Sequence, residues 1–244
     1  CASLTTISDV PIDDLAPGSA ALEASGAFLT GFCRPDEARA LASQTSRRAG
    51  ILGRHEVPLY QGLRCEKRRL DWLAGRLAAK RALRRYFCDL QGRSPALTAL
   101  EISYDSQGAP RCALAQAPFL SISHCAAGGL CAVGLSGRRV GADWEVVVSR
   151  GPELTRLFAC PGELPLGPED PFAQTRLWAL KEAALKLLGL GLAAAPTEVR
   201  AQPWLGLAGR TRQRWEDLGS PALRPVVARV RGCVAAVVHS QPRA

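Results

Sequence analysis

The chain has 244 residues and a formal net charge of +9, with 47% hydrophobic and 22% charged residues, which are globular proportions for one large domain or two small ones. No apolar run reaches the roughly 18–20 residues of a membrane span. The nine cysteines are odd in number and never spaced as Cys-x-x-Cys, which argues against a zinc site and a disulfide scaffold. We therefore expect a cytoplasmic protein with no membrane partner and no signal or transit peptide.

The first part of the chain predicts helices. Residues 1–30 are mixed in character, and short strands are plausible there. Pro35, followed by two acidic residues, favours a helix that runs to Ser43 or Arg48, because proline and acids suit a first helical turn. Residues 64–90 form a stronger helix, rich in leucine, alanine, arginine and lysine, which we expect to end before Gly92.

The long helix is strongly basic. Between residues 64 and 85, nine basic side chains stand against two acidic ones. Arg69, Arg76 and Lys80 follow each other at spacings of seven and four, so they line one face of the helix. A basic patch of this kind indicates a polyanionic partner, such as a nucleic acid, a phosphorylated ligand or an acidic protein.

The middle of the chain predicts strands. Residues 99–104 are expected to form one strand, followed by a turn at 105–110, and residues 119–123 and 130–135 a pair of strands. A further strand begins at Val140, and residues 151–169 form a connection rich in proline and glycine with a possible short helix.

The last part of the chain predicts one long helix and then short strands. Asp170 can cap a helix with Pro171 at its first position, running to Gly189. Strand candidates follow at 204–208 and 225–239. This order predicts an α+β fold of two similar halves related by pseudo-twofold symmetry, each a small sheet packed on a long helix. We place the halves at 1–139 and 140–244.

Four charged residues near the start of the second half could converge. Asp143 and Glu145 point to the same side of the strand from Val140, because strand side chains alternate. Trp178, Glu182 and Lys186 are four residues apart and therefore share one stripe of the following helix. Carboxylate oxygens suit Mg²⁺, which also binds substrate phosphates, and the lysine would supply charge to a phosphoryl oxygen. The pattern thus favours metal-assisted phosphoryl transfer.

Each of these signals has an ordinary explanation. An Asp-x-Glu pair on a strand is usually a solvated face, and a Glu and Lys four apart on a helix are a common surface pair. Here, however, both pairs stand among apolar residues. Charges in apolar surroundings are costly unless they are paired or bound to a metal.

Five motifs together resemble those of the 4′-phosphopantetheinyl transferase superfamily. They are Val140-Gly-Ala-Asp-Trp-Glu145, Trp178-x-x-Lys-Glu-Ala-x-x-Lys186, Ser121-Ile-Ser-His-Cys125, the Gly-x-Pro loop at Gln107-Gly-Ala-Pro110, and the helix from Lys67 to Leu83, which resembles the coenzyme A-binding helix. The length and the two-half pattern resemble the longer, monomeric members that serve secondary-metabolite synthases.

The resemblance implies an enzyme that moves phosphopantetheine from coenzyme A to a serine of an acyl or peptidyl carrier protein and releases 3′,5′-ADP. Carriers of fatty-acid, polyketide or nonribosomal peptide biosynthesis would be its partners. It assigns Asp143, Glu145 and Glu182 to Mg²⁺, or Mn²⁺ in its place, and makes Glu182 and Lys186 catalytic, with Glu182 as the base. The coenzyme A contacts that it implies are Arg68, Arg76, Gly108, Pro110, Ser123, His124, Asp143 and Lys186.

The chain departs from the family pattern at two places. Ala142 stands where valine or isoleucine is common. Gln107 and Ala109 occupy a loop that commonly carries a phosphate-binding lysine. Either Arg111 compensates for that lysine or coenzyme A binds more weakly.

Two other functions compete with the transferase. The first is a nucleic-acid-binding module that uses the helix at 64–85. It is disfavoured because the chain has only three tyrosines and its aromatics are not interleaved with the basic stripe. We therefore expect no nucleic-acid partner. The second is an inactive relative that only binds carrier proteins, which the intact carboxylates disfavour.

Overall fold

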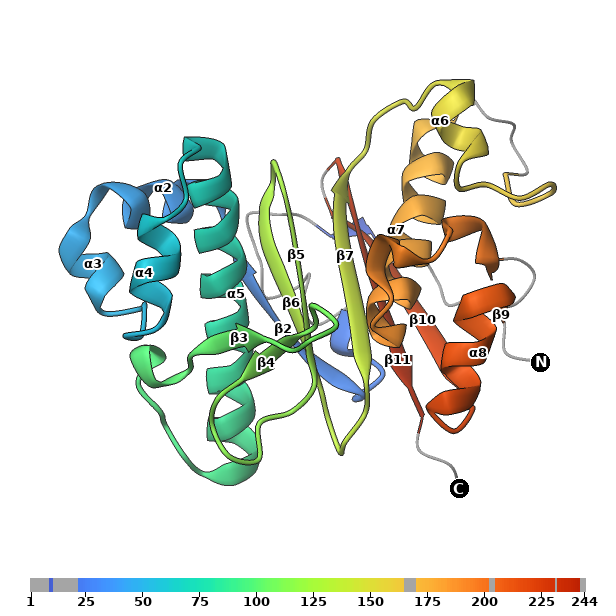
Figure 1. Ribbon diagram of the computed structural model, residues 1–244. Coiled ribbons are helices and arrows are strands. Elements are labelled where there is room, and N and C mark those ends of the chain that lie inside the picture. The colour runs from blue at the N-terminus through green and yellow to red at the C-terminus, as the bar shows by residue number, and fades with distance from the viewer. Residues whose placement is uncertain (1–8, 11–21, 165–169, 202–204, 231, 242–244) are drawn as a thin grey trace.

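A computed structural model describes residues 9–10, 22–164, 170–201, 205–230 and 232–241. It confirms the α+β fold, with helices on the two outer sides and strands between them (Figure 1). The helices are α2 (Pro35–Ser43), α3 (Thr45–Ala49), α4 (Glu56–Gln61), α5 (Glu66–Gln91), α6 (Pro152–Arg156), α7 (Pro171–Leu188) and α8 (Gly209–Asp217). Short 3₁₀ turns lie at Leu97–Ala99, Gly191–Ala193 and Pro196–Glu198.

The strands form two main sheets, each next to one long helix. The first sheet has the order β2-β6-β5 and packs on α5, and the second has the order β1-β10-β11-β7 and packs on α7. Every neighbouring pair is antiparallel except β1 and β10. Their bounds are β1 (Asp9–Val10), β2 (Phe28–Cys33), β5 (Leu120–Cys125), β6 (Gly128–Gly134), β7 (Val140–Val146), β10 (Leu223–Val230) and β11 (Cys233–Ser240).

Two small hairpins complete the described strands. They are β3 (Ile102–Tyr104) with β4 (Pro110–Cys112), and β8 (Val199–Arg200) with β9 (Gly206–Leu207). Pairing of β1 with β10 joins a segment from the start of the chain to the sheet of the second half. The division into 1–139 and 140–244 stays a prediction.

Glycines bring the strands unusually close to the long helices. A Cβ atom at Gly31 or Gly129 would collide with the backbone of α5. A Cβ atom at Gly141 would collide with the backbone oxygen of Ala183 and the backbone nitrogen of Leu187 on α7. Because only glycine lacks this atom, these positions set the distance between sheet and helix in each half.

Most of the elements expected from the sequence are present. The helices at 66–91 and 171–188 match the predictions, and Asp170 caps the second by accepting hydrogen bonds from the backbone N–H groups of Phe172 and Ala173. The segment 225–239 is not one strand: β10 and β11 form an antiparallel hairpin there. The predicted strand at 99–104 begins only at Ile102. Neither α4 nor α8 was predicted.

Some expectations fall on residues outside this description. The short strands expected in residues 1–30 lie mostly outside the described residues. The same holds for residue 204 of the strand candidate at 204–208. Among the helices that are described, none is both long and apolar enough to cross a membrane.

Candidate active site

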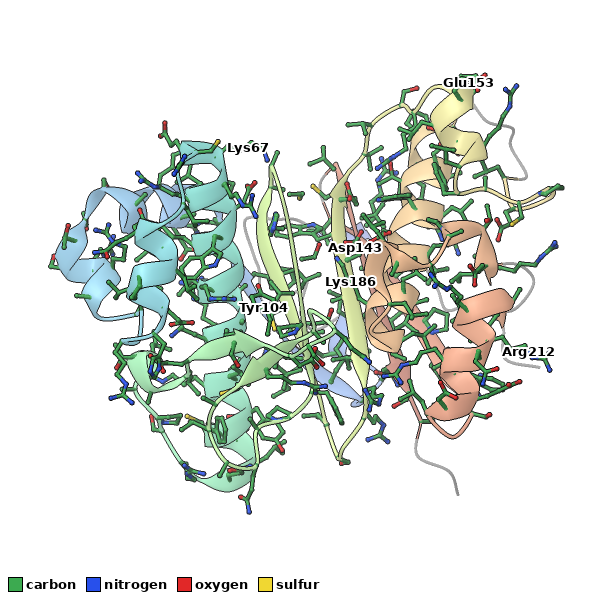
Figure 2. The ribbon with its side chains drawn as sticks, viewed as in Figure 1. Lys67, Tyr104, Asp143, Glu153, Lys186 and Arg212 are labelled. Carbon is green, nitrogen blue, oxygen red and sulfur yellow. The ribbon has the colours of Figure 1, made fainter. Side chains whose placement is uncertain are left out.

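The site centres on Asp143, at the middle of β7. Because Gly141 lets β7 lie directly against α7, Asp143 comes within reach of α7, and Lys186 donates a hydrogen bond of 2.6 Å from Nζ to its Oδ1 atom. Figure 2 shows the two side chains together between strand and helix. Asp143 is 3% exposed, whereas the lysine side chain is 27% exposed and reaches solvent. The predicted convergence of strand and helix is therefore present at this pair.

Two serines of β5 fix β7 beside the first sheet. The Ser123 hydroxyl donates to Asp143 Oδ1 at 2.8 Å and accepts from the backbone N–H of Trp144 at 3.1 Å. The Ser121 hydroxyl accepts from the backbone N–H of Ala142 at 2.9 Å. Both serines are buried. Ser123, predicted to contact coenzyme A, thus orients the Asp143 carboxylate.

Glu145 lies two residues further along the same side of β7. Its Oε1 atom accepts a hydrogen bond of 3.2 Å from the indole N–H of Trp178, and its Oε2 atom lies 3.6 Å from an Arg150 guanidinium nitrogen. Burial raises the pKa of Glu145, and the negative charge of Asp143 raises it further. Trp178, which shares a stripe of α7 with Glu182 and Lys186, thus holds this carboxylate.

Glu182 completes the group of carboxylates from α7. It is 8% exposed, and its Oε1 atom has no hydrogen-bond partner among the described residues. Burial raises the pKa of Glu182, the charges of Asp143 and Glu145 add to the increase, and Lys186 opposes it. The carboxylates therefore influence one another electrostatically, and Glu182 binds a proton more readily than an ordinary glutamate.

The donor set fits a hard divalent cation. Asp143 Oδ2 is a second buried carboxylate oxygen without a partner in the described part of the chain. Unpartnered buried oxygens of this kind are costly unless a proton or a cation compensates them. No three His, Cys, Asp or Glu side chains of the described residues are grouped closely enough to hold a metal ion as they stand. Asp143, Glu145 and Glu182 remain a predicted rather than a preformed metal site.

The sequence of this region matches one protein family. Residues 139–224 match the model of the 4′-phosphopantetheinyl transferase superfamily. The match includes β7, α7, α8 and the start of β10, and therefore contains every carboxylate described above. No curated protein matches the chain.

His124 is a further residue that we predict to contact coenzyme A. It follows Ser123 on β5 with an exposed side chain. Partial desolvation lowers the pKa of the ring, and the positive charges of Lys186 and Lys67 lower it further, against the opposing effect of Asp71. His124 is thus neutral at pH 7.

The two arginines predicted to hold the 3′-phosphate have different surroundings. Arg68 is exposed on the first turn of α5. Arg76 is 2% exposed: its Nε atom lies 3.3 Å from Glu56, and its guanidinium stacks on the rings of Trp72 and Tyr104. The Nη2 atom of Arg76 has no hydrogen-bond partner among the described residues, and contacts of Arg68 and Arg76 with the 3′-phosphate both stay predictions.

Much of the basic face of α5 is neutralised within the fold. Lys80 is fully buried and paired with Glu56, Arg81 binds Glu37, and Arg85 binds Glu23. These pairings weigh against the alternative function of nucleic-acid binding, which needs a row of free cations along the helix.

The carboxylate of Asp105 holds the loop at Gln107–Pro110 in place. Gly108 has a φ of +78°, and the Asp105 carboxylate accepts from the backbone N–H groups of Gln107 and Ala109. Arg111 also pairs with Asp105 at 2.9 Å, so it is not a free substitute for the missing lysine.

Two further arginines surround this loop. Arg214 of α8 donates to Gln107 Oε1 at 3.1 Å. Burial lowers the pKa of Arg139, as do the positive charges of Arg111 and Arg214. Cations that repel one another in this way are favourable partners for an anion. The contact between Gln107 and Arg214 spans the two halves, so local sequence patterns give no sign of it.

Proposed function

We propose that this protein transfers the 4′-phosphopantetheine arm of coenzyme A to a serine of an acyl or peptidyl carrier protein and releases 3′,5′-ADP. The superfamily match supports phosphopantetheinyl transfer in general. The observation that carries the proposal is the buried Asp143, paired with Lys186 and close enough to Glu182 to raise the pKa of that carboxyl.

Glu182 is the base in the proposed mechanism. Its raised pKa makes it a stronger base than an ordinary carboxylate, and its Oε1 atom has no other partner in the described residues. Glu182 takes the proton from the carrier serine, whose oxygen then attacks the phosphorus that bears the pantetheine arm. The bond from this phosphorus to the bridging oxygen breaks, and 3′,5′-ADP leaves with the bond electrons.

Lys186 and a cation bound by the carboxylates would neutralise the negative charge of the phosphates. A divalent cation, Mg²⁺ or Mn²⁺, would offset the charge on the pyrophosphate when it is bound by Asp143, Glu145 and Glu182. Lys186 reaches solvent from its contact with Asp143, so it can turn to a phosphate oxygen of the leaving group. Ser123 holds the Asp143 carboxylate in position throughout.

Coenzyme A would lie along the junction between α5 and α7. We assign His124 and Arg68 to its phosphates and the backbone of Gly108 and Pro110 to the adjacent moiety. Two further arginines at the same loop, Arg139 and Arg214, are our candidates for the function of the missing lysine.

Carrier proteins are typically acidic, and the net charge of +9 would speed their encounter with the enzyme. We propose that the enzyme acts as a monomer in the cytoplasm. Which biosynthetic carrier it modifies would follow from a panel of purified apo carriers.

The test is the intact mass of an apo carrier after incubation with enzyme, coenzyme A and Mg²⁺. Wild-type enzyme should add one phosphopantetheine group, whereas Asp143→Asn and Glu182→Gln should each slow transfer by about 10²–10⁴-fold. Glu153→Gln is the matched control, because Glu153 is an exposed glutamate whose ion pair among the described residues is with Arg156. Removal of metal with EDTA should stop transfer, and added Mn²⁺ should restore it. Undiminished transfer by both site variants would refute the assignment.

A further inference from the structure

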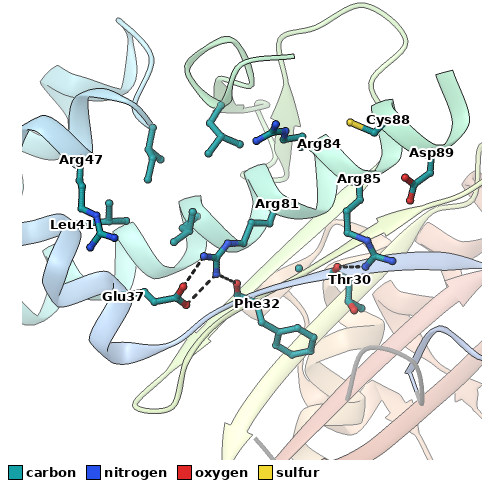
Figure 3. A pocket seen from close by; sticks show the side chains of 14 residues that line it. Thr30, Phe32, Glu37, Leu41, Arg47, Arg81, Arg84, Arg85, Cys88 and Asp89 are labelled. Carbon is teal, nitrogen blue, oxygen red and sulfur yellow. Dashed lines mark hydrogen bonds and ion pairs between the residues drawn. The ribbon is translucent and has the colours of Figure 1, made fainter. Parts of the chain in front are cut away.

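A pocket lies beside α5, away from Asp143, Glu145 and Glu182. It has a volume of about 860 Å³, within the range of small-molecule sites, and opens between β2, the α2–α3 pair and α5 (Figure 3). None of the residues assigned to the transferase site lines it. Its lining is Thr30, Gly31, Phe32, Glu37, Leu41, Arg47, Ile51, Leu77, Arg81, Arg84, Arg85, Cys88, Asp89 and Leu97.

Part of the wall of this pocket is aliphatic. Leu41 of α2 and Leu77 of α5 are buried, and Ile51 and Leu97 pack against the same core. Such a surface would take the hydrocarbon part of a ligand, because removing apolar area from water is favourable at about 25 cal/mol per Å².

Two of the four arginines in the pocket hold the fold together. Arg81 donates to Glu37 at 2.6 Å and to the Phe32 carbonyl at 2.7 Å. Arg85 donates to the Thr30 carbonyl at 2.9 Å and is also paired with a glutamate. These two side chains join α5 to β2 and are already neutralised by carboxylates. The Asp89 carboxylate acts on Arg85 as well, since its charge helps to raise the pKa of that guanidinium.

The other two arginines are not neutralised. The guanidinium groups of Arg47 of α3 and Arg84 of α5 form no hydrogen bond or ion pair with any described residue, and both side chains are exposed at the pocket. Helix α3 is nevertheless held in place, because Arg48 donates to the carbonyls of Leu41 and Ala42 at 2.9 and 2.8 Å. The pocket thus combines an apolar wall with two available guanidinium groups on fixed helices.

We propose that this pocket binds an amphipathic anion, with its hydrocarbon part along the aliphatic wall and its acidic group in the positive field of Arg47 and Arg84. A carboxylate and a phosphate monoester share the required chemistry, because a guanidinium binds either in bidentate fashion. This ligand differs from coenzyme A in place and in contacts, so the inference does not depend on the proposed transfer reaction.

Cys88 provides a reporter inside the pocket. Its thiol is free and half-buried, whereas Cys65 is a free, exposed thiol at the start of α5 and is not part of the lining. The experiment measures alkylation of each cysteine by iodoacetamide, read by peptide mass, as decanoate or decyl phosphate is titrated below its micelle-forming concentration. We expect the ligand to protect Cys88 from alkylation in a saturable way and to leave the alkylation of Cys65 unchanged.

Variants and neutral probes decide whether charge recognition is involved. Arg47→Gln and Arg84→Gln should each weaken protection by about tenfold. Arg156→Gln, at an exposed arginine of α6, should leave protection unchanged. Preference for decanoate or for decyl phosphate would identify the acidic group, and either preference supports the proposal. Equal protection by uncharged decanol, undiminished protection in both arginine variants, or no protection at all would overturn it.

Discussion

Replacing Gly141 by alanine tests how closely β7 must approach α7. The added Cβ atom would overlap backbone atoms of Ala183 and Leu187, which cannot rotate away as the end of a side chain could. Restoring an ordinary contact of about 3.5 Å requires strand and helix to separate by on the order of 1 Å. We therefore expect the substitution to displace Asp143 from Lys186 and Glu182.

The expected cost has two parts. Overpacking of a well-packed core costs typically about 1–3 kcal/mol, which lowers the melting temperature by roughly 2–12 °C at this chain length. A displacement of about 1 Å at the reacting groups costs on the order of 10²-fold in rate. Gly141→Ala should therefore lose more activity than its loss of stability explains.

The assay compares melting by circular dichroism with transfer rates well below the melting temperature. Gly151→Ala is the control, because no atom lies within 4 Å of its added Cβ and its φ of −58° suits alanine. It should stay within about 0.5 kcal/mol of wild type. If Gly141→Ala melts and reacts like the control, the close approach of β7 to α7 does not position the site.

Three further predictions concern buried polar groups. Glu163→Gln should cost about 3–5 kcal/mol of stability at neutral pH, because the fully buried Lys181 loses the negative charge that lies 2.7 Å away. Glu153→Gln should cost almost nothing, because its ion pair is exposed. Equal melting temperatures of the two variants would contradict this. Ser123→Ala should destabilise the fold by about 1–3 kcal/mol and slow transfer, since the Trp144 N–H and one Asp143 bond lose their partner; a variant with wild-type rate and stability in denaturant titration would count against a positioning role. Burial lowers the pKa of His239, so below about pH 6.5 the unfolded chain binds a proton that the folded chain does not, and stability falls as pH falls; His239→Asn should reduce this slope in melting curves between about pH 6.5 and 5, and an unchanged slope would contradict it.

The sequence predicts those parts of the fold that depend on local pattern. Periodic apolar residues identify the helices at 66–91 and 171–188, and the apolar residues that precede and follow Asp143 identify β7. The hairpin of β10 and β11 was missed because its valine and alanine run is nearly continuous, although Gly232, with a φ of +58°, marks the turn. The short, strongly polar α8 lacks the long apolar stripe by which a helix is recognised.

The site could be predicted in part for the same reason. Asp143 and Lys186 are brought together by two adjacent elements whose patterns are clear. Arg76 has the spacing of a surface cation but is buried beside Glu56. The sequence does not predict this burial, because Glu56 lies on the short helix α4, whose local sequence pattern is weak. Arg139 and Arg214 belong to distant segments, and only the tertiary fold shows that they surround the same loop.

Binding of Mn²⁺, followed by electron paramagnetic resonance with coenzyme A present, tests the central claim most directly. That claim is that the carboxylates of β7 and α7 jointly hold a divalent cation beside the substrate. We predict one saturable class of bound Mn²⁺ in the wild type and in Glu153→Gln, and its loss in Asp143→Asn and in Glu182→Gln. Binding that is equally tight in all four proteins would contradict the account.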